Sequence, residues 1–265
     1  MAEQRIFTLV TGASNGIGQA LAEDSALRGD NVLLVALPEP KLEEVTNALK
    51  AQYPNQEFHC LGKDLMQKEA PQEIYDWCRE KGFVIDKLMN NAGLGNSGAF
   101  DTKTSQFYYG QMQLNMVNLV MLTHLFLKDL KTLPQAYILN VASMAAFYDI
   151  PYKGIYSASK RFVYSFSRSL RKELEASNVE VTVLCPAAVL TNPDVLARNE
   201  QMGFFSKLTQ ATPQEVAEYT IDRMLKGKAV AIPKAVPRFY KALGRIIPYN
   251  MKMNILAKQF IKQQQ

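Results

Sequence analysis

Short apolar runs alternate along the chain with longer segments that carry apolar residues at helical spacing. The apolar runs predict strands at residues 5–11, 31–36, 57–61, 86–89, 136–141, 179–184 and 229–232. The segments between them predict helices at residues 16–28, 39–52, 69–81, 105–131, 154–177 and 213–226. This alternation predicts an α/β fold: a doubly wound, parallel, seven-stranded sheet with helices on both faces. Because no linker or internal repeat interrupts it, residues 1–233 are expected to form a single domain.

The composition is that of an ordinary globular protein. Of 265 residues, 48% are apolar and 21% are charged, which argues against wholesale disorder. The three cysteines are scattered and odd in number, which is typical of a reducing compartment rather than of a disulfide framework. The first apolar run is too short for a signal peptide, and no run approaches the roughly 20 apolar residues of a membrane-spanning helix. We therefore expect a cytoplasmic protein.

The net charge of +5 is unevenly distributed. Residues 1–222 hold 20 Lys and Arg against 25 Asp and Glu, whereas residues 223–265 hold 10 Lys and Arg and no acid. The positive excess therefore belongs to the C-terminal part, which argues against a nucleic-acid-binding body. In residues 234–265 basic and apolar positions alternate, which predicts one or two short amphipathic helices. Such an extension could contact an anionic membrane, the acidic body or a second subunit.

A glycine-rich loop follows the first predicted strand directly. The segment Gly12–Gly18 (GASNGIG) lies between that strand and the helix expected at 16–28. Glycines let the backbone approach a ligand closely, and the free N–H groups at a helix start attract a phosphate. A strand, a glycine turn and a helix in this order predict a pyrophosphate-binding loop.

Polar residues recur where the later strands end. Asp64 follows the third strand and Asn91 the fourth, while Ser143 follows the fifth and Thr191 the sixth. The carboxyl ends of parallel strands meet at one edge of a sheet, and ligands of such sheets bind there. These residues therefore predict a nucleotide site.

Ser143, Tyr156 and Lys160 form a candidate catalytic group. If the segment around Tyr156 is helical, a spacing of four residues places Tyr156 and Lys160 on one face. A phenol with a pKa near ~10 transfers protons poorly at neutral pH, but a nearby ammonium lowers that pKa. Ser143 could then hold a substrate oxygen against the phenol. Alone, the Tyr-x-x-x-Lys pattern is also common on amphipathic helices that carry no chemistry.

Metal and serine-hydrolase chemistry are not expected. His59 and Cys60 are adjacent on a predicted strand and therefore point to opposite faces, which makes them poor joint ligands. No other spacing among the two histidines and three cysteines suggests zinc. With only two histidines in the chain, a serine-hydrolase triad is also not expected.

Together these motifs resemble the short-chain dehydrogenase/reductase family over nearly the whole chain. Thr11–Gly18 (TGASNGIG) is similar to its TGxxxGxG cofactor loop, and Asn90–Gly93 (NNAG) to its NNAG segment. Ser143, Tyr156 and Lys160 are similar to its serine and Tyr-x-x-x-Lys. The resemblance implies a Rossmann-like fold and an NAD(P)-dependent oxidoreductase that interconverts a carbonyl and an alcohol. The alternative is a cofactor-binding redox sensor of this fold, although such regulators commonly lose the tyrosine or the lysine.

The resemblance also implies a role for each site residue. Tyr156 would transfer a proton to or from the substrate oxygen, and Lys160 would lower its pKa and bind the nicotinamide ribose. Ser143 would orient the oxygen, and Asn115 would hold a water of the proton relay. The implied cofactor contacts are Gly12, Ser14, Asn15, Gly16, Ile17, Gly18, Leu37, Asp64, Leu65, Asn91, Ala92, Gly93, Tyr156, Lys160, Val189 and Thr191. Among them, Asp64 would lie beside the adenine.

Two departures from the family pattern bear on the cofactor. Pro186 is followed by Ala187, where the family often has glycine, so this loop is expected to approach the nicotinamide with an altered shape. Leu37, at the end of the second strand, offers neither an acid for the NAD ribose nor an arginine for the NADP phosphate. Glu39 could disfavour the phosphate and Lys41 could favour it. NADP or NAD stays open, with a slight preference for NADP because relatives with this layout commonly use it.

The resemblance extends to the substrate side and to assembly. Residues 192–212 are similar to the family's substrate lid, with Phe204 and Phe205 in an apolar wall, and could also form a surface helix with an apolar underside. The substrate would be a small, uncharged or weakly polar carbonyl or alcohol. A homodimer or homotetramer would form through the helices at 105–131 and 154–177.

Overall fold

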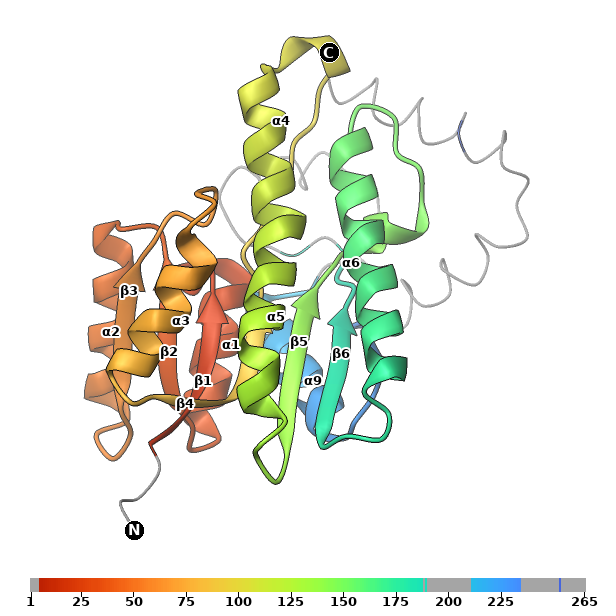
Figure 1. The fold of residues 1–265 in the computed structure, drawn as a ribbon. Coiled ribbons are helices and arrows are strands. Elements are labelled where there is room, and N and C mark those ends of the chain that lie inside the picture. Colours follow the sequence, from red (N-terminus) through yellow and green to blue (C-terminus); the bar gives the residue numbers. More distant parts are fainter. Residues whose placement is uncertain (1–4, 188, 190–210, 235–252, 254–265) are drawn as a thin grey trace.

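Seven parallel strands form one sheet within residues 5–187, 189, 211–234 and 253, which the computed structural model describes (Figure 1). The strands are β1 (Ile6–Thr11), β2 (Asn31–Ala36), β3 (Phe58–Gly62), β4 (Val84–Asn90), β5 (Ala136–Val141), β6 (Val179–Leu184) and β7 (Val230–Ala231). Their order is β3-β2-β1-β4-β5-β6-β7. Because the chain winds outward in both directions from the β1–β4 pair, the predicted doubly wound parallel sheet is confirmed.

Helices cover both faces of the sheet (Figure 1). They are α1 (Gly16–Leu27), α2 (Pro40–Gln52), α3 (Ala70–Glu80), α4 (Ser105–Met112), α5 (Asn118–Leu130), α6 (Gly154–Glu173) and α9 (Pro213–Leu225). One core joins Val10 of β1 to apolar residues of α1, α2 and α9, and the other joins Leu9 to residues of α3, α5 and α6. Successive strand residues are thus buried on opposite faces, which explains the continuous apolar runs in the sequence.

The helix predicted at 105–131 is interrupted by a π-helical turn. A π-helical segment, η2 (Gln113–Val117), lies between α4 and α5. Such segments close i to i+5 hydrogen bonds and occur frequently at functional sites. The predicted catalytic residue Asn115 lies within η2 and is buried.

The other predicted elements agree with the structure to within a few residues. The largest difference is at α6, which ends at Glu173 rather than at residue 177. The backbone N–H and the hydroxyl of Ser177 both donate to the carbonyl of Leu174, each at 2.8 Å, and this local bonding closes the helix. The spacing of apolar residues predicts a helix that continues to residue 177, whereas Ser177 itself favours a turn.

Some sequence expectations lie outside the described residues. These are the extension from residue 235 onward, apart from 253, and the lid from 192 to 210. Within the described residues, no helix is long and apolar enough to cross a membrane. The same residues contain no group of three or more His, Cys, Asp or Glu that could hold a metal ion. His59 packs against Phe83 with ring centroids 4.8 Å apart, as expected for a structural histidine.

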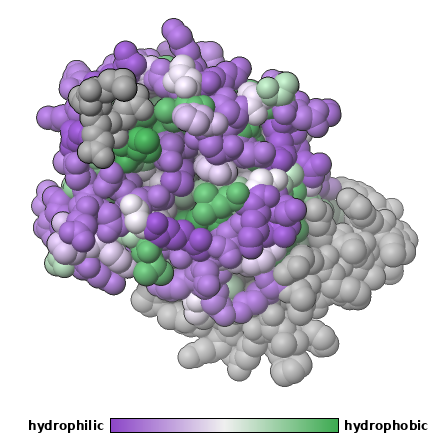
Figure 2. Space-filling view, turned by 90° about the horizontal axis from the view of Figure 1, so that it is seen from below, coloured by the Kyte–Doolittle hydropathy of each residue, from purple (hydrophilic) through white to green (hydrophobic). Residues whose placement is uncertain are grey.

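The two edges of the sheet differ in character. Seen from the edge at which the strands begin, the surface is mostly hydrophilic, with apolar side chains in small separate patches (Figure 2). The loops after β1, β4, β5 and β6 all lie at the opposite, carboxyl edge. The candidate residues of the sequence therefore gather at one end of the molecule.

α1 approaches the end of β1 at a distance that requires glycine. A Cβ on Gly18 would lie 2.0 Å from the carbonyl oxygen of Gly12 and 2.4 Å from the side-chain nitrogen of Asn91. Since packed interiors leave no room for such overlap, any side chain at position 18 must push α1 away from the sheet. The close approach brings the N-terminus of α1 to the carboxyl edge.

We expect Gly18→Ala to lower the free energy of unfolding by about 3 kcal/mol, because α1 must move away from β1. Gly154→Ala is the matched control, since a Cβ at this other helical glycine meets no atom within 4 Å. Urea unfolding followed by circular dichroism measures both. Equal stability of the two variants would contradict the steric argument.

Candidate active site

The carboxyl ends of β1, β4, β5 and β6 surround a cavity of about 380 Å³. Its lining residues are Gly12, Asn15, Gly16, Ile17, Asn91, Ala92, Gly93, Gly95, Val141, Ala142, Ser143, Tyr156, Lys160, Pro186, Ala187 and Val189. The predicted phosphate loop and the predicted catalytic group Ser143, Tyr156 and Lys160 thus share one cavity. Gly95, Val141 and Ala142 were not predicted, because nothing in an isolated glycine or an apolar strand end marks it as a wall.

The glycine loop has the backbone of an anion cradle. Gly12 and Gly16 have φ of +66° and +56°, a left-handed conformation that other residues adopt only with strain. Asn15 caps α1 by accepting a hydrogen bond from the N–H of Gly16 at 2.8 Å. The remaining N–H groups of the first turn have no partner within the helix and attract negative charge. Gly18, in contrast, serves the packing of α1 and does not line the cavity.

Thr11 and Asn91 join the end of β1 to the loop after β4. The Asn91 side-chain nitrogen donates to the carbonyl of Thr11 at 2.9 Å. The Thr11 hydroxyl oxygen in turn accepts the backbone N–H groups of Asn91 (3.0 Å) and Ala92 (3.1 Å). Thr11 was part of the predicted motif, but its role as a double acceptor follows only from the pairing of β1 with β4.

Ser143 and Tyr156 meet across the cavity. Ser143 follows β5 by two residues and caps the 3₁₀ segment η3 (Met144–Phe147), where its Oγ accepts the N–H of Ala145 at 3.1 Å. Burial raises the pKa of the Tyr156 phenol, and a hydrogen bond with Ser143 lowers that pKa in part. The phenol therefore stays protonated at neutral pH and faces the cavity beside a hydroxyl that fixes its direction.

Lys160 is a buried cation one helical turn from Tyr156. Its ammonium donates to the carbonyl of Val141 at 2.8 Å and lies 6.0 Å from the centroid of the Tyr156 ring. Burial lowers the pKa of Lys160 from 10.5 to about 8. The predicted effect of Lys160 on the pKa of Tyr156 is not among the causes of the raised value, where burial and Ser143 act instead. That effect stays a prediction.

Asn115 connects three elements. Its Oδ1 accepts the N–H of Leu94 at 2.8 Å, and its Nδ2 donates to the carbonyl of Leu94 (2.9 Å) and to the hydroxyl of Ser159 on α6 (3.1 Å). The side chain therefore holds the loop after β4 against the helix that carries Tyr156. Its predicted contact with a water of a proton relay stays a prediction.

Beneath the cavity, buried amides join the sheet to the helices. Asn90 at the end of β4 donates to the Oδ1 of Asn140 on β5 at 2.9 Å and to the hydroxyl of Thr123 on α5 at 3.1 Å. Asn140 donates in turn to Ser167 on α6 at 3.0 Å. These hydrogen bonds fix α6 relative to the strand ends, although the Oδ1 of Asn90 has no partner among the described residues.

The predicted adenosine contacts lie beyond the cavity, at the ends of β2 and β3. Asp64 accepts the N–H of Met66 at 2.8 Å, Leu65 is buried, and Leu37 is 48% exposed. Because β2 lies next to β1 and β3 next to β2, these residues extend the site along the carboxyl edge of the sheet. Of the remaining predicted contacts, Val189 lines the cavity and Ser14 does not. Thr191 lies outside the described residues.

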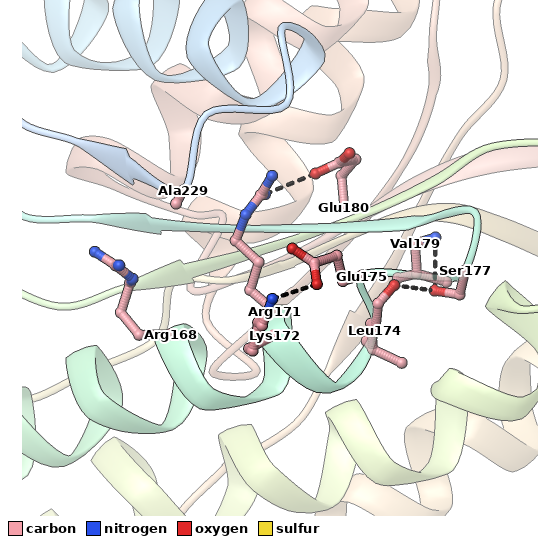
Figure 3. A pocket seen from close by; sticks show the side chains of 9 residues that line it. All are labelled: Arg168, Arg171, Lys172, Leu174, Glu175, Ser177, Val179, Glu180 and Ala229. Carbon is pink, nitrogen blue, oxygen red and sulfur yellow. Dashed lines mark hydrogen bonds and ion pairs between the residues drawn. The ribbon is translucent and has the colours of Figure 1, made fainter.

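A second cavity, of about 280 Å³, lies between the end of α6 and the start of β6 (Figure 3). Four of its five charged residues form ion pairs: Arg171 with Glu180 at 2.6 Å, and Lys172 with Glu175. Arg171 also donates to the carbonyl of Gly227 at 2.9 Å. These contacts fasten the end of the helix to the opposite edge of the sheet, so we assign this cavity no role in chemistry.

Comparison with known proteins agrees with this geometry. A sequence profile described as short chain dehydrogenase matches residues 7–203. The very-long-chain 3-oxoacyl-CoA reductase of Anas platyrhynchos is 30% identical over 258 residues, covering 95% of this chain and 79% of the relative. Two solved structures are similar. The bulky-bulky ketone specific alcohol dehydrogenase of Comamonas testosteroni has a TM-score of 0.78 at 26% identity, with 92% of both chains covered. A short-chain dehydrogenase of Sphingobium yanoikuyae in complex with NADPH has a TM-score of 0.77 at 27% identity, covering 90% and 92%.

A parallel sheet with a glycine cradle and a Ser, Tyr and Lys group at one edge defines an oxidoreductase with a dinucleotide-binding fold. The chain belongs to the short-chain dehydrogenase family. It is an enzyme of that family that acts on carbonyl or alcohol substrates.

Lys160 gives a test of the buried cation. The folded protein holds this proton less tightly than the unfolded chain, so the buried ammonium opposes folding below about pH 8, and the penalty is relieved as the pH rises toward 10.5. We expect Lys160→Met to be about 2 kcal/mol more stable than the wild type at pH 7, an advantage that shrinks at pH 10.

Urea unfolding at pH 7 and pH 10 measures the two differences. Lys128→Met, on the exposed side of α5, is the control and should change stability little at either pH. A Lys160→Met protein that is less stable than the wild type at pH 7 would contradict the assignment of a strained buried cation.

Proposed function

We propose that the enzyme interconverts a carbonyl and an alcohol with NAD(P) as the hydride carrier and Tyr156 as the proton donor or acceptor. The observation that carries this proposal is the convergence of a glycine cradle and the group Ser143, Tyr156 and Lys160 on one cavity. A buried lysine held at a free-energy cost beside a tyrosine is typical of a site that carries out chemistry.

The residues present fit a dinucleotide. The left-handed Gly12 and Gly16 and the N-terminus of α1 form a concave surface of N–H groups, and a Cβ on Gly12 would come within 3.0 Å of Ala92 Cα. This loop would hold the pyrophosphate, while Leu37 and Asp64 would lie toward the adenosine. When bound, the nicotinamide supplies or accepts the hydride.

The chain's own residues handle the substrate oxygen and its proton. Ser143 has a hydroxyl directed at Tyr156, so an oxygen placed between them receives two hydrogen bonds. Because the pKa of Tyr156 is raised, the phenol is protonated at neutral pH and is ready to donate to the oxygen of a carbonyl as it is reduced. The reverse reaction needs the phenolate and is therefore favoured at higher pH.

The cavity wall supports an apolar carbonyl substrate. Ala142, Pro186, Ala187 and Val189 contribute apolar surface beside the polar Ser143. The similar proteins named above are a very-long-chain 3-oxoacyl-CoA reductase and an alcohol dehydrogenase specific for bulky ketones. A ketone with an uncharged, bulky substituent is consistent with both observations.

Assembly into a homodimer or homotetramer is part of the same proposal. η2, α5 and α6 lie on the same face of the sheet (Figure 1), and each carries an exposed apolar side chain. Val117, Met121 and Phe162 are each about 40% exposed, and Phe162 stacks on Phe166. A second copy placed against this face would bury them.

Tyr156→Phe removes the proton donor and keeps the ring. We expect kcat to fall at least about 100-fold while NADPH binds with unchanged affinity. Steady-state kinetics on a panel of ketones, aldehydes and alcohols and NADPH fluorescence titration measure the two quantities. Tyr109→Phe, at an exposed position of α4, is the control. Full turnover by Tyr156→Phe would overturn the mechanism, and NADPH binding without turnover by the wild type would favour a redox sensor.

The cofactor preference has its own test. Leu37 is exposed at the end of β2, so Leu37→Asp places an acid where ribose hydroxyls are expected. The wild type should bind NADPH somewhat more tightly than NADH, and the variant should shift the affinity ratio toward NADH at least about tenfold. Leu27→Asp, an exposed leucine on α1, is the control. An unchanged ratio in Leu37→Asp would show that the adenosine ribose lies elsewhere.

A further inference from the structure

The loop after β4 forms the wall of the cavity nearest to Tyr156. A Cβ on Gly93 would lie 3.0 Å from the Lys160 nitrogen, and one on Gly95 would lie 3.6 Å from the Tyr156 ring. With glycines at 93, 95 and 98, the loop has little conformational preference of its own. Its position must therefore be set by contacts with the rest of the protein.

Gln111 on α4 supplies such contacts. Its side-chain nitrogen donates to the carbonyl of Leu94 at 3.0 Å and to the Oδ1 of Asn96 at 2.9 Å, so both of its hydrogens are used on the loop. Gln111 is fully buried, and its Oε1 has no hydrogen-bond partner in the part of the chain that the structure describes. Burying an amide with one unsatisfied atom costs free energy, so an apolar side chain would suit the packing better.

Gln111 and Asn115 hydrogen-bond different parts of the loop after β4. They are four residues apart, and both side chains donate to the carbonyl of Leu94. Asn115 also accepts the N–H of Leu94, but it does not reach beyond that residue. Gln111 reaches Asn96, two residues further on, and so fixes the stretch that passes the Tyr156 ring.

We infer that Gln111 is a positioning residue that sets the substrate-facing wall of the active site through Leu94 and Asn96. The inference rests on the proposed function in placing the carbonyl substrate beside Tyr156. Losing the two hydrogen bonds should loosen residues 95–97, and this should weaken substrate binding more than the chemical step. The glycine cradle lies around β1 and α1, and the predicted cofactor contacts Asn91, Ala92 and Gly93 precede residues 95–97, so cofactor affinity should change little.

Two variants of the full chain remove the contact from opposite ends. Gln111→Met keeps the length of the side chain and removes both donors. Asn96→Ala removes one acceptor from the half-buried end and leaves the sequence of α4 unchanged, so it serves if Gln111→Met folds poorly. Gln106→Met, the same substitution at an exposed position of α4, is the matched control.

Hydrogen exchange followed by mass spectrometry reports on the loop without any need for turnover. Exchange of the peptide covering residues 93–99 should be about tenfold faster in Gln111→Met and Asn96→Ala than in the wild type and Gln106→Met, with and without NADPH. Unchanged exchange in both loop variants would overturn the inference, whatever the enzyme's substrate is.

Kinetics then separate positioning from a general loss of structure. For the carbonyl compound that the wild type reduces, KM should rise about tenfold in Gln111→Met while kcat changes less than threefold and the NADPH dissociation constant less than twofold. A parallel loss of kcat and NADPH affinity would instead assign Gln111 to stability alone. Failure of the proposed function would appear as absent turnover in the wild type, with the exchange result still deciding whether the loop is held by Gln111.

Discussion

The site depends on the close approach of α1 to the end of β1. The carbonyl of Gly12 lies where a side chain on Gly18 would be, and the Asn91 amide donates to the neighbouring carbonyl of Thr11. The start of α1, the end of β1 and the loop after β4 therefore meet at the same few peptide groups. No one of the three can shift without breaking contacts that position the other two, so the phosphate cradle and the start of the loop after β4, at Asn91 and Ala92, are built as one unit.

At the other end of the cavity the constraint is electrostatic. Lys160 is buried against the carbonyl of Val141, and its lowered pKa shows that the surroundings disfavour its charge. Tyr156 is disfavoured as an anion for the same reason, with Ser143 opposing the shift. The buried, low-dielectric pocket thus holds the phenol of Tyr156 and the destabilised ammonium of Lys160 close together. Such an arrangement is common where a proton must be transferred near neutral pH.

The alternation of strands and helices, and the polar residues at strand ends, allowed the fold and most of the cavity lining to be predicted from sequence. Both signals are local or follow directly from sheet topology. The hydrogen bond from Gln111 to Asn96 could not be predicted, because it depends on how α4 packs against a loop residue 15 positions earlier in the chain. The causes of the raised pKa of Tyr156, which are burial and Ser143 and not Lys160, could not be predicted either. The spacing of two residues indicates that they are close, but it does not indicate how far they are shielded from water.

The π segment at η2 has a consequence for comparing this chain with its relatives. A π turn holds one residue more than the α turn it replaces. A relative lacking that residue between 113 and 117 would continue as a plain α-helix, and because the π turn takes up the extra residue, the side chains on either side would keep their directions. An ungapped alignment across this point would then equate residues that face different directions. The length of this helix, as well as its composition, therefore indicates which relatives can place side chains equivalent to Gln111 and Asn115 against the loop after β4.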